Sequence, residues 1–300
     1  MQQSGAVCEF SNSNSWVILS PIEQSIKRKI EAVGTPLKDW DIQINYGIKT
    51  GCNEAFIISS EKRDEILANC QTEDERKRTA ELIRPILRGR DIKRYGYNWA
   101  NLWLINTHNG LKNKGIKSID INDYPAIKKW LDYGGVAYNG KMYKGFSQIE
   151  RRADQGDTPY NLRNCAYWED FSKPKMLWKR VGSILRFCYN DNEALGLDST
   201  CFATGENIEF ICCVLNSPMG HYLLKDAPKT GTGDLLVSVQ AIEPIQIPQV
   251  GLETNSEFKK LLESLIKTDS PSNEKEISRK VFKLYDLSLE EQSYIEENFT

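Results

Sequence analysis

The stretch 44–58 reads INYGIKTGCNEAFII and contains residue types that could bind a phosphate group. Gly47 and Gly51 flank Lys49 and Thr50, a pattern that lets backbone amides and a cation approach an anion closely. A nucleotide-binding P-loop needs four residues between its glycines and a lysine directly after the second glycine. Here three residues separate the glycines and the lysine precedes the second one, and no GxGxxG fingerprint occurs. The pattern therefore favours a tight hairpin with glycines at positive φ over a nucleotide cradle.

Two further stretches concentrate basic side chains beside aromatic ones. The run 84–94, RPILRGRDIKR, holds five bases and one acid, and the run 173–186, KPKMLWKRVGSILR, holds five bases and no acid. The aromatic residues beside or within them are Tyr95, Tyr97, Trp99 and Trp178. Bases neutralise phosphates and flat rings stack on nucleobases, so the combination is typical of a nucleic-acid groove. Solvated basic faces and tryptophans of the core remain the alternative interpretation.

The whole-chain composition is that of an ordinary soluble globular protein. The 300 residues are 40% apolar and 27% charged, with a net charge of −2. The charge is uneven, because residues 253–300 carry 11 acids and 7 bases, a net of −4, and the remainder carries 30 acids and 32 bases, a net of +2. No apolar run approaches the roughly 18 residues that a membrane span needs. The first residues lack the layout of a signal peptide, so a cytoplasmic protein without a membrane contact is expected.

Residues for an enzyme active site or a metal site are sparse. The eight cysteines form no CxxC pair, and His108 and His221 are the only histidines, so no metal site is predicted. The cysteines are interpreted as core residues in a reducing compartment. No GxSxG and no HExxH motif occurs, and the carboxylates do not pair convincingly, so no catalytic residue is assigned. The pattern indicates a binding module.

Local patterns predict a mixed α+β fold with several short strands. Helix signals are the capping box that starts at Ser20, the cap at Thr72, a short helix over 125–133 and a buried helix from Ile208. Strands are expected at 41–48, 55–58, 99–105, 175–179, 183–189 and 199–204. Residues 134–165 have weak periodicity and are expected to be irregular. From about residue 254 apolar stripes at helical spacing predict a short all-helical tail that packs against something.

Several phrases, in their order along the chain, closely resemble one known family. They are IQINYGIKTGCNEAFII, ELIRPILRGRDIKRY, LWLINTHNG, DYPAIKKWL, TPYNLRNCAYWEDFSKPKMLW, CVLNS and QAIEPIQIP. This ordered set resembles the C-terminal specificity domain of Taq-type adenine DNA methyltransferases, which also occurs in fused type IIG restriction-modification enzymes. The resemblance covers roughly residues 15 to 250. The phrase ISRKVFKLYDLSLEEQSYIEE resembles the helical end of the same proteins.

The resemblance implies a target-recognition domain over 16–252, with twisted β-sheets and packed helices, followed by the helical tail over 253–300. Residues 1–15 would be a linker remnant. Such a domain grips double-stranded DNA opposite a methyltransferase catalytic domain, in cis or in trans, and reads base edges while an adenine is flipped out. The family's catalytic Asn/Asp-Pro-Pro-Tyr motif and glycine-rich S-adenosylmethionine site do not occur here. S-adenosylmethionine, and Mg²⁺ for any cleavage, are expected in that catalytic part.

The resemblance and the basic runs together suggest a set of DNA-contacting side chains. Arginines beside Gly89 are the candidate base readers and the lysines and arginines that follow are candidate phosphate contacts. The predicted DNA-binding residues are Lys49, Thr50, Asn53, Arg88, Arg90, Lys93, Arg94, Arg151, Arg152, Arg163, Lys175 and Arg180, positioned by the loop glycines Gly47, Gly51 and Gly89. Lys175 and Arg180 are the weaker candidates, because a strand can turn one of them inward. Lys49→Ala is expected to weaken DNA binding without unfolding the protein.

Two other functions stay open at this point. A divergent metal-dependent nuclease would need a carboxylate pair whose mutation abolishes cleavage. A protein-interaction module would use the acidic helical tail to dock a catalytic subunit, and deletion of 254–300 would then abolish assembly. The second of these is compatible with DNA recognition, because a specificity domain must dock its catalytic partner.

Overall fold

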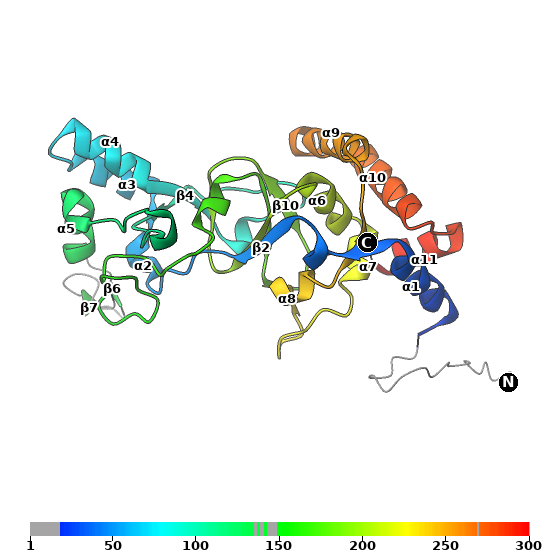
Figure 1. Cartoon of the computed structure of the whole chain (residues 1–300). Helices are drawn as coiled ribbons and strands as arrows, with labels where there is room; N and C mark the ends of the chain where they lie inside the picture. Colours follow the sequence, from blue (N-terminus) through cyan, green and yellow to red (C-terminus); the bar gives the residue numbers. More distant parts are fainter. Residues whose placement is uncertain (1–18, 135–136, 139–140, 143–148, 269, 300) are drawn as a thin grey trace.

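The computed structural model describes residues 19–134, 137–138, 141–142, 149–268 and 270–299. Helices and strands are mixed along the chain, which confirms the α+β class. The predicted linker at 1–15 lies outside the described residues. The molecule is elongated, with one group of helices at each end and the larger sheets between them (Figure 1). The helices at one end are α3 (Ser60–Ala68), α4 (Glu73–Leu82) and α5 (Pro125–Tyr133), and the tail helices at the other end are α9 (Leu252–Thr268), α10 (Pro271–Leu284) and α11 (Leu289–Phe299).

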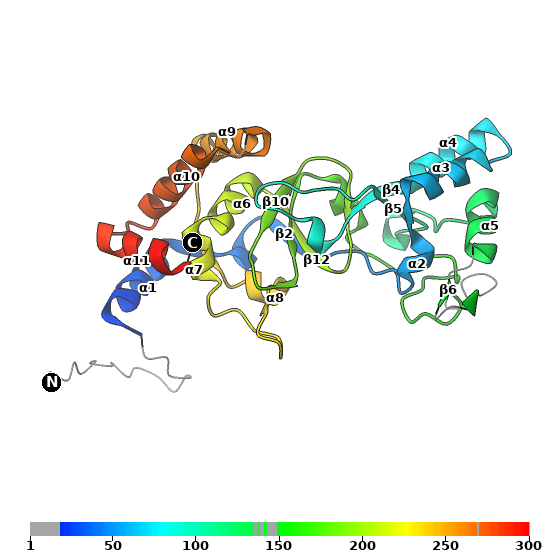
Figure 2. The ribbon, with the colours of Figure 1, turned by 180° about the vertical axis from the view of Figure 1, so that it is seen from behind.

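Helix α1 (Pro21–Val33) has the ends that its sequence predicts. The Glu23 backbone N–H donates to Ser20 Oγ at 3.3 Å and the Ser20 N–H donates to the Glu23 carboxylate at 3.0 Å, so the capping box is complete. The helix ends at Gly34, the first residue of β1 (Gly34–Pro36). Strand β1 pairs with β14 (Gln246–Pro248). Helix α1 also lies beside α11 in both views (Figures 1 and 2), where Lys29 Nζ is 2.7 Å from a Glu291 carboxylate oxygen.

An antiparallel sheet forms the centre of the molecule. Its strand order is β10 (Phe187–Asn190), β8 (Lys175–Lys179), β12 (Thr200–Gly205) and β2 (Ile42–Tyr46). Successive side chains of a strand point to opposite faces. Met176 and Trp178 therefore enter the core on the α6 side, whereas Leu177 enters the core on the other side. This sheet is buried on both faces, which explains the uninterrupted apolar run Met-Leu-Trp in β8.

A second, mixed sheet lies next to the first. Its order is β11 (Leu195–Gly196), β4 (Ile83–Leu87), β5 (Leu102–Ile105) and β3 (Ile57–Ser59). Strand β11 runs parallel to β4 and the other neighbours are antiparallel. Helix α4 leads directly into β4, and its N-cap Thr72 accepts from the backbone N–H of Glu75 at 3.1 Å as its sequence predicts. Helices α3, α4 and α5 pack at the far end of this sheet.

The opening stretch 44–58 connects the two sheets, so the predicted hairpin is wrong. Strand β2 pairs with β12 in the central sheet, and β3 pairs with β5 in the second sheet. The strand predicted over 55–58 is also partly wrong, because α2 (Asn53–Phe56), a single helical turn, precedes β3. Gly51 does have the expected positive φ of 69°. Gly47 instead allows a close approach, since a Cβ there would lie 2.0 Å from the carbonyl oxygen of Leu197.

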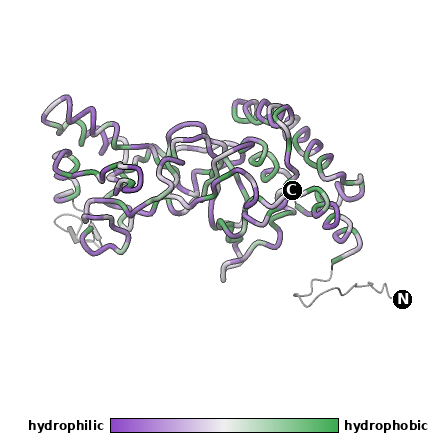
Figure 3. Tube along the Cα trace, in the orientation of Figure 1, coloured by the Kyte–Doolittle hydropathy of each residue, from purple (hydrophilic) through white to green (hydrophobic). Residues whose placement is uncertain are grey.

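The tail helices pack against the chain itself. Helix α6 (Ile208–Asn216) is buried along its length, and Phe258, Leu262 and Leu265 of α9 join the same core. The Phe258 ring meets the Phe210 ring edge-on at 4.9 Å between centroids. Hydrophilic and hydrophobic residues alternate along these tail helices (Figure 3). Most of the apolar stripe of α9 is therefore covered by the central part of the chain.

The remaining elements are short. They are α7 (Pro218–Leu223), α8 (Val239–Ile242), the pair β6 (Ala137–Tyr138) and β7 (Lys141–Met142), the pair β9 (Val181–Gly182) and β13 (Leu235–Leu236), and single 3-10 turns at Leu37–Asp39, Gly89–Asp91, Lys112–Lys114, Ile121–Asp123 and Trp168–Ser172. Within the described ranges no helix is long and apolar enough to cross a membrane. The described cysteines are all free, and most are buried as predicted.

Candidate nucleic-acid interface

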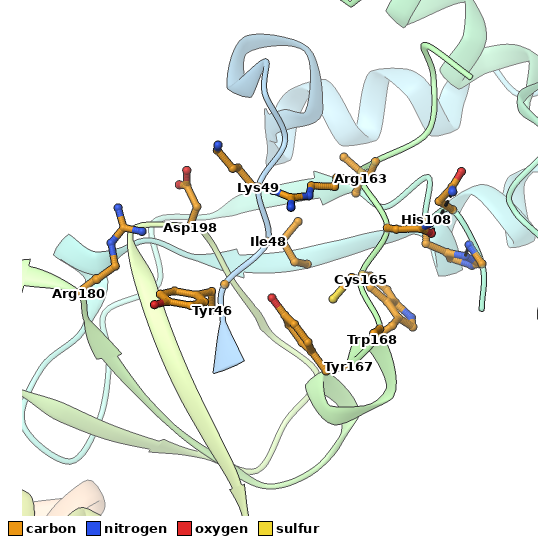
Figure 4. Close-up of a pocket in the computed structure, with 16 residues that line it drawn as sticks. Tyr46, Ile48, Lys49, His108, Arg163, Cys165, Tyr167, Trp168, Arg180 and Asp198 are labelled. Atoms are coloured by element: carbon orange, nitrogen blue, oxygen red, sulfur yellow. Dashed lines mark hydrogen bonds between the residues drawn. The ribbon is translucent and has the colours of Figure 1, made fainter. Parts of the chain in front are cut away.

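A hollow of about 530 Å³ lies where the opening stretch passes between the sheets (Figure 4). Three segments wall it: the end of β2 with the opening stretch, the turn at 108–110, and the segment 162–168. Arg180 and Asp198 complete the lining. The segment 162–168 begins in the region predicted to be irregular, and the Leu162 N–H donates a hydrogen bond to Thr107 O at 2.8 Å.

The lining of this hollow is basic. Lys49, Arg163 and Arg180, which come from three distant parts of the sequence, line it together with one acid, Asp198. Lys49 and Arg163 are largely exposed, and both reach the carboxylate of Asp154 beside the hollow, at 3.0 and 3.4 Å. Arg180 forms no ion pair with another described residue, and its Nε has no hydrogen-bond partner there. Three of the predicted DNA contacts are thus brought together.

Aromatic rings form the other part of the lining. Tyr46, Tyr167 and Trp168 line the hollow, and the Trp168 ring lies 5.6 Å from that of His108. Burial raises the pKa of Tyr167 to about 12 and lowers the pKa of His108, so both are neutral near pH 7. These rings therefore contribute flat, uncharged surfaces between the cations. Neither Tyr167 nor Trp168 was singled out from the sequence, because aromatic residues are as often core residues as ligand contacts.

A second hollow, of about 630 Å³, meets the first at Asp198, which lines both. Asn53 and Glu54 of α2, the Arg88–Arg90 turn and Lys179 of β8 line it. Gly89 lets this turn approach β8 closely, since a Cβ would lie 2.8 Å from Lys179 Cγ and 2.9 Å from the Ser199 carbonyl oxygen. The Gly89 N–H donates to Ser199 Oγ at 3.0 Å. The two hollows together are called the basic face below.

The two arginines beside Gly89 have different surroundings. The Arg88 guanidinium donates two hydrogen bonds to the Asp91 carboxylate, at 3.1 and 2.8 Å, and these raise the pKa of Arg88. Arg90 is exposed and pairs with no acid among the described residues. Of the two, Arg90 is the side chain available to an incoming ligand. Lys179 is similarly exposed and unpaired within the described chain. The sequence signal for Lys179 is its position at the end of the predicted strand 175–179, where side chains emerge into solvent.

Three predicted contacts are buried, so their side chains do not lie on the surface where the prediction placed them. Thr50 is 1% exposed and its Oγ1 donates to Asn53 Oδ1 at 2.5 Å. Lys175 is fully buried, its Nζ donates to Asn192 O at 2.6 Å, and burial lowers its pKa to about 8. Arg152 is 5% exposed. These polar groups can turn inward because acceptors are there for their hydrogen bonds, backbone carbonyls for Lys175 and Arg152 and the Asn53 side chain for Thr50.

The Arg152 guanidinium joins the opening stretch to the segment 152–161. It donates to the carbonyl oxygens of Thr50 and Asn161, to Asp154 O at 2.8 Å and to Pro159 O at 3.0 Å. It also lies 4.5 Å from the centre of the Phe56 ring. Burial lowers its pKa to about 10, which leaves it charged near neutral pH. Arg152 therefore holds the wall of the hollow in place.

The remaining predicted contacts lie away from the hollows. Arg94 donates to Asn216 O at 3.0 Å and pairs with Glu274 of α10 at 3.1 Å, so it ties the end of the basic run to the tail. Lys93 is half-buried beside it. Arg151 is exposed next to the buried Arg152 and forms no ion pair with a described residue. No three His, Cys, Asp or Glu side chains of the described residues come together as a metal site would require.

Comparison with known proteins gives a methyltransferase as a relative in sequence. No family model matches the chain. It is 22% identical over 288 residues to the type II methyltransferase M.PaeR7I of Pseudomonas aeruginosa, a match that covers 94% of this chain and 45% of that protein. This agreement confirms the resemblance to restriction-modification methyltransferases. The chain thus spans about half the length of the curated relative.

The chain also superposes on parts of solved structures. The type IIL restriction-modification enzyme MmeI in complex with DNA superposes with a TM-score of 0.56 at 10% identity, over 89% of this chain and 36% of that chain. The type IIG restriction endonuclease BpuSI gives a TM-score of 0.48 at 11% identity, over 93% of this chain and 33% of that chain. Over most of its length the chain is therefore similar in sequence to a type II methyltransferase and in fold to a type IIL restriction-modification enzyme.

Proposed function

We propose that this chain is the DNA target-recognition part of an adenine-N6 methyltransferase of a restriction-modification system. S-adenosylmethionine-dependent methylation, and any Mg²⁺-dependent cleavage, would reside in a methyltransferase part that acts in cis or in trans. The observation that carries the proposal is the basic face. Lys49, Arg163 and Arg180 surround a hollow lined by aromatic rings, and Arg90 and Lys179 extend it.

The chemistry of this face suits duplex DNA. Exposed lysines and arginines exchange weakly held partners for phosphates and release counterions, which provides affinity without sequence information. Arg90 and Arg180 are the candidates for reading guanine, because an unpaired guanidinium can donate two parallel hydrogen bonds to O6 and N7. Asp198 is the candidate for reading cytosine, because a carboxylate accepts from the N4 amino group. Readers and phosphate contacts then lie on one continuous surface.

The buried cations have a different part in this proposal. Arg152 and Lys175 hold backbone segments through carbonyl acceptors, so they position the face and do not touch DNA. Thr50 does the same for Asn53. The MmeI structure gives independent support to the proposal, because it is a complex with DNA. That structure has also been described as having implications for engineering new specificities. The superposition is with a part of that enzyme, and DNA binding by the present chain is our extension.

The interaction-module alternative gains less support. That alternative has the acidic tail dock a catalytic subunit, and buried apolar residues of the tail pack on α6 of the same chain. Surface charge on the tail remains accessible to a methyltransferase part, so docking and DNA recognition are compatible.

The proposal is tested by changing charge at the basic face alone. A triple variant, Lys49→Ala with Arg163→Ala and Arg180→Ala, is compared with a control triple, Lys260→Ala with Lys267→Ala and Lys275→Ala. The control changes the net charge equally, at three exposed tail lysines far from the face. Binding to a duplex is measured by fluorescence anisotropy between about 50 and 200 mM salt.

The face triple is expected to bind DNA more weakly and to flatten the plot of log affinity against log salt by up to about 0.9 per lost phosphate contact. The control triple is expected to bind like the unchanged chain. Equal losses in both triples would show that only net charge matters and would contradict the assignment of this face.

A further inference from the structure

One carboxylate pairs with two of the exposed cations that line the first hollow. Asp154 Oδ2 lies 3.0 Å from Lys49 Nζ, and its other oxygen, Oδ1, lies 3.4 Å from Arg163 Nη1. Each oxygen thus holds one cation, as two non-bridging phosphate oxygens can. The Asp154 side chain is 14% exposed, whereas those of Lys49 and Arg163 are 53% and 63% exposed. The carboxylate therefore sits beneath the two cations, which remain open to solvent and line the same hollow.

The position of this carboxylate is fixed by the fold. The backbone carbonyl of Asp154 accepts a hydrogen bond from Arg152, which also holds Thr50. Gly51, with its positive φ, lets the opening stretch approach closely, since a Cβ there would lie 3.1 Å from Asp154 Cβ. A charge held this way acts on every ligand that approaches the hollow.

We propose that Asp154 is a specificity-determining residue: its carboxylate occupies Lys49 and Arg163 in the free protein and so suppresses sequence-independent binding to DNA. This inference rests on the proposed function. The physical reason is that sequence-independent affinity depends on the number of cations that phosphates can neutralise. Exposed ion pairs contribute little free energy, so a duplex that also makes base contacts can displace the carboxylate, whereas a duplex that offers phosphates alone gains less from doing so.

The test is Asp154→Asn in the 300-residue chain. Asparagine keeps the size of the side chain and the backbone contact with Arg152, but it removes the negative charge. With a random-sequence duplex as the probe, the variant is expected to bind roughly fivefold more tightly at low salt, as removal of one charge near 4 Å in water implies. The plot of log affinity against log salt is expected to steepen by about 0.9 for each additional cation that phosphates neutralise.

A matched control is available in the tail. Glu276 of α10 also bridges two cations, Arg279 at 2.7 Å and Lys280 at 3.7 Å, and it lies at the opposite end of the molecule from α5. Glu276→Gln is expected to leave DNA affinity unchanged. In a background of Lys49→Ala with Arg163→Ala, Asp154→Asn is expected to leave the salt dependence unchanged, because no paired cations remain to be freed for phosphates.

The outcomes distinguish the inference about Asp154 from the proposed function. If the unchanged chain binds duplex DNA but Asp154→Asn neither tightens binding nor steepens the salt dependence, the inference is wrong and the proposed function stands. An effect of Glu276→Gln as large as that of Asp154→Asn would also overturn the inference alone. If neither the unchanged chain nor Asp154→Asn binds any duplex at low salt, the proposed function and the inference are both contradicted.

Discussion

The guanidinium of Arg152 shows what a cation does when backbone carbonyls surround it. Its hydrogen bonds reach from Thr50 to Asn161, and its face covers Phe56. Arg151, the preceding residue, is exposed and has no acidic partner among the described residues. Two adjacent arginines thus differ in role because one finds acceptors inside the protein. At the scale of single residues, the role of each of these arginines is decided by its burial and its hydrogen-bond partners, and not by its residue type.

We expect Arg152→Met to destabilise the fold. The substitution leaves several carbonyl oxygens without their donor in a buried site, which costs about 3 kcal/mol in the free energy of unfolding. Arg151→Met, one position away, is expected to change it by less than about 0.5 kcal/mol, as exposed substitutions do. Urea unfolding followed by circular dichroism measures both. Similar values for the two variants would show that the carbonyl contacts of Arg152 contribute little.

Lys175 predicts an alkaline pH dependence of stability. Burial lowers its pKa to about 8, from the 10.5 of an unburied lysine. Below pH 8 the amine is charged in the folded and unfolded states. Between about 8 and 10.5 only the unfolded state keeps the proton, so this group makes the free energy of unfolding rise with pH, by up to about 1.4 kcal/mol per pH unit.

The contribution of Lys175 is isolated by comparison with Lys175→Met. The free energy of unfolding of the unchanged chain minus that of the variant is expected to be flat below about pH 7 and to rise as the pH passes through about 8. Cysteines and tyrosines titrate in the same range, but they are present in both proteins and largely cancel in the difference. A difference that stays flat up to pH 10.5 would mean that Lys175 titrates normally.

At the scale of elements, the segment from Gly47 to Cys52 matters because it crosses between sheets. Its residues contact both β11 and the segment 152–154, so a small shift there moves one wall of the hollow. Ile48 N–H donates to Gly196 O at 2.7 Å, and Asp198 N–H donates to Ile48 O at 2.9 Å. The basic face therefore depends on how the backbone from Gly47 to Cys52 crosses between the sheets, and not only on which side chains it carries.

Gly47→Ala tests this crossing. A Cβ at Gly47 would lie 2.0 Å from the Leu197 carbonyl oxygen, which is backbone and cannot rotate away. Overpacking of this kind costs about 1–3 kcal/mol, and the displaced segment should also weaken DNA binding. Gly96→Ala is the control, because nothing lies within 4 Å of its Cβ position. Thermal unfolding and duplex binding are both measured, and equal behaviour of the two variants would count against the crossing as a support.

The sequence predicted those elements whose signals are local. Helix α5 and strand β8 match their predicted ranges, and helix α1 begins after the predicted capping box, because proline, caps and apolar periodicity mark these elements. The hairpin prediction for the stretch 44–58 was wrong because its strands pair with β12 and β5, and no local pattern records those partners. For the same reason the sequence suggested Lys49, Arg163 and Arg180 separately. It did not indicate that Asp154 joins two of them.

At the scale of the whole molecule, the tail and the central sheet share one core. Leu262 of α9 is fully buried there, whereas Ile266 of the same helix is 46% exposed. We expect Leu262→Ala to lower the free energy of unfolding by about 2–5 kcal/mol and Ile266→Ala to change it by less than about 1 kcal/mol. Calorimetry should show a single transition that Leu262→Ala shifts as a whole. Two transitions, with only one shifted, would mean that the tail folds independently.

The proposed function requires the basic face to bind one DNA sequence in preference to others. The most direct measurement is to bind the 300-residue chain, alone and with its methyltransferase part, to a pool of randomised duplexes and to sequence the bound fraction. We predict enrichment of one recurring site, whose affinity exceeds that of the bulk pool roughly a thousandfold or more. A bound fraction indistinguishable from the input pool, or no binding at low salt under either condition, would contradict this function.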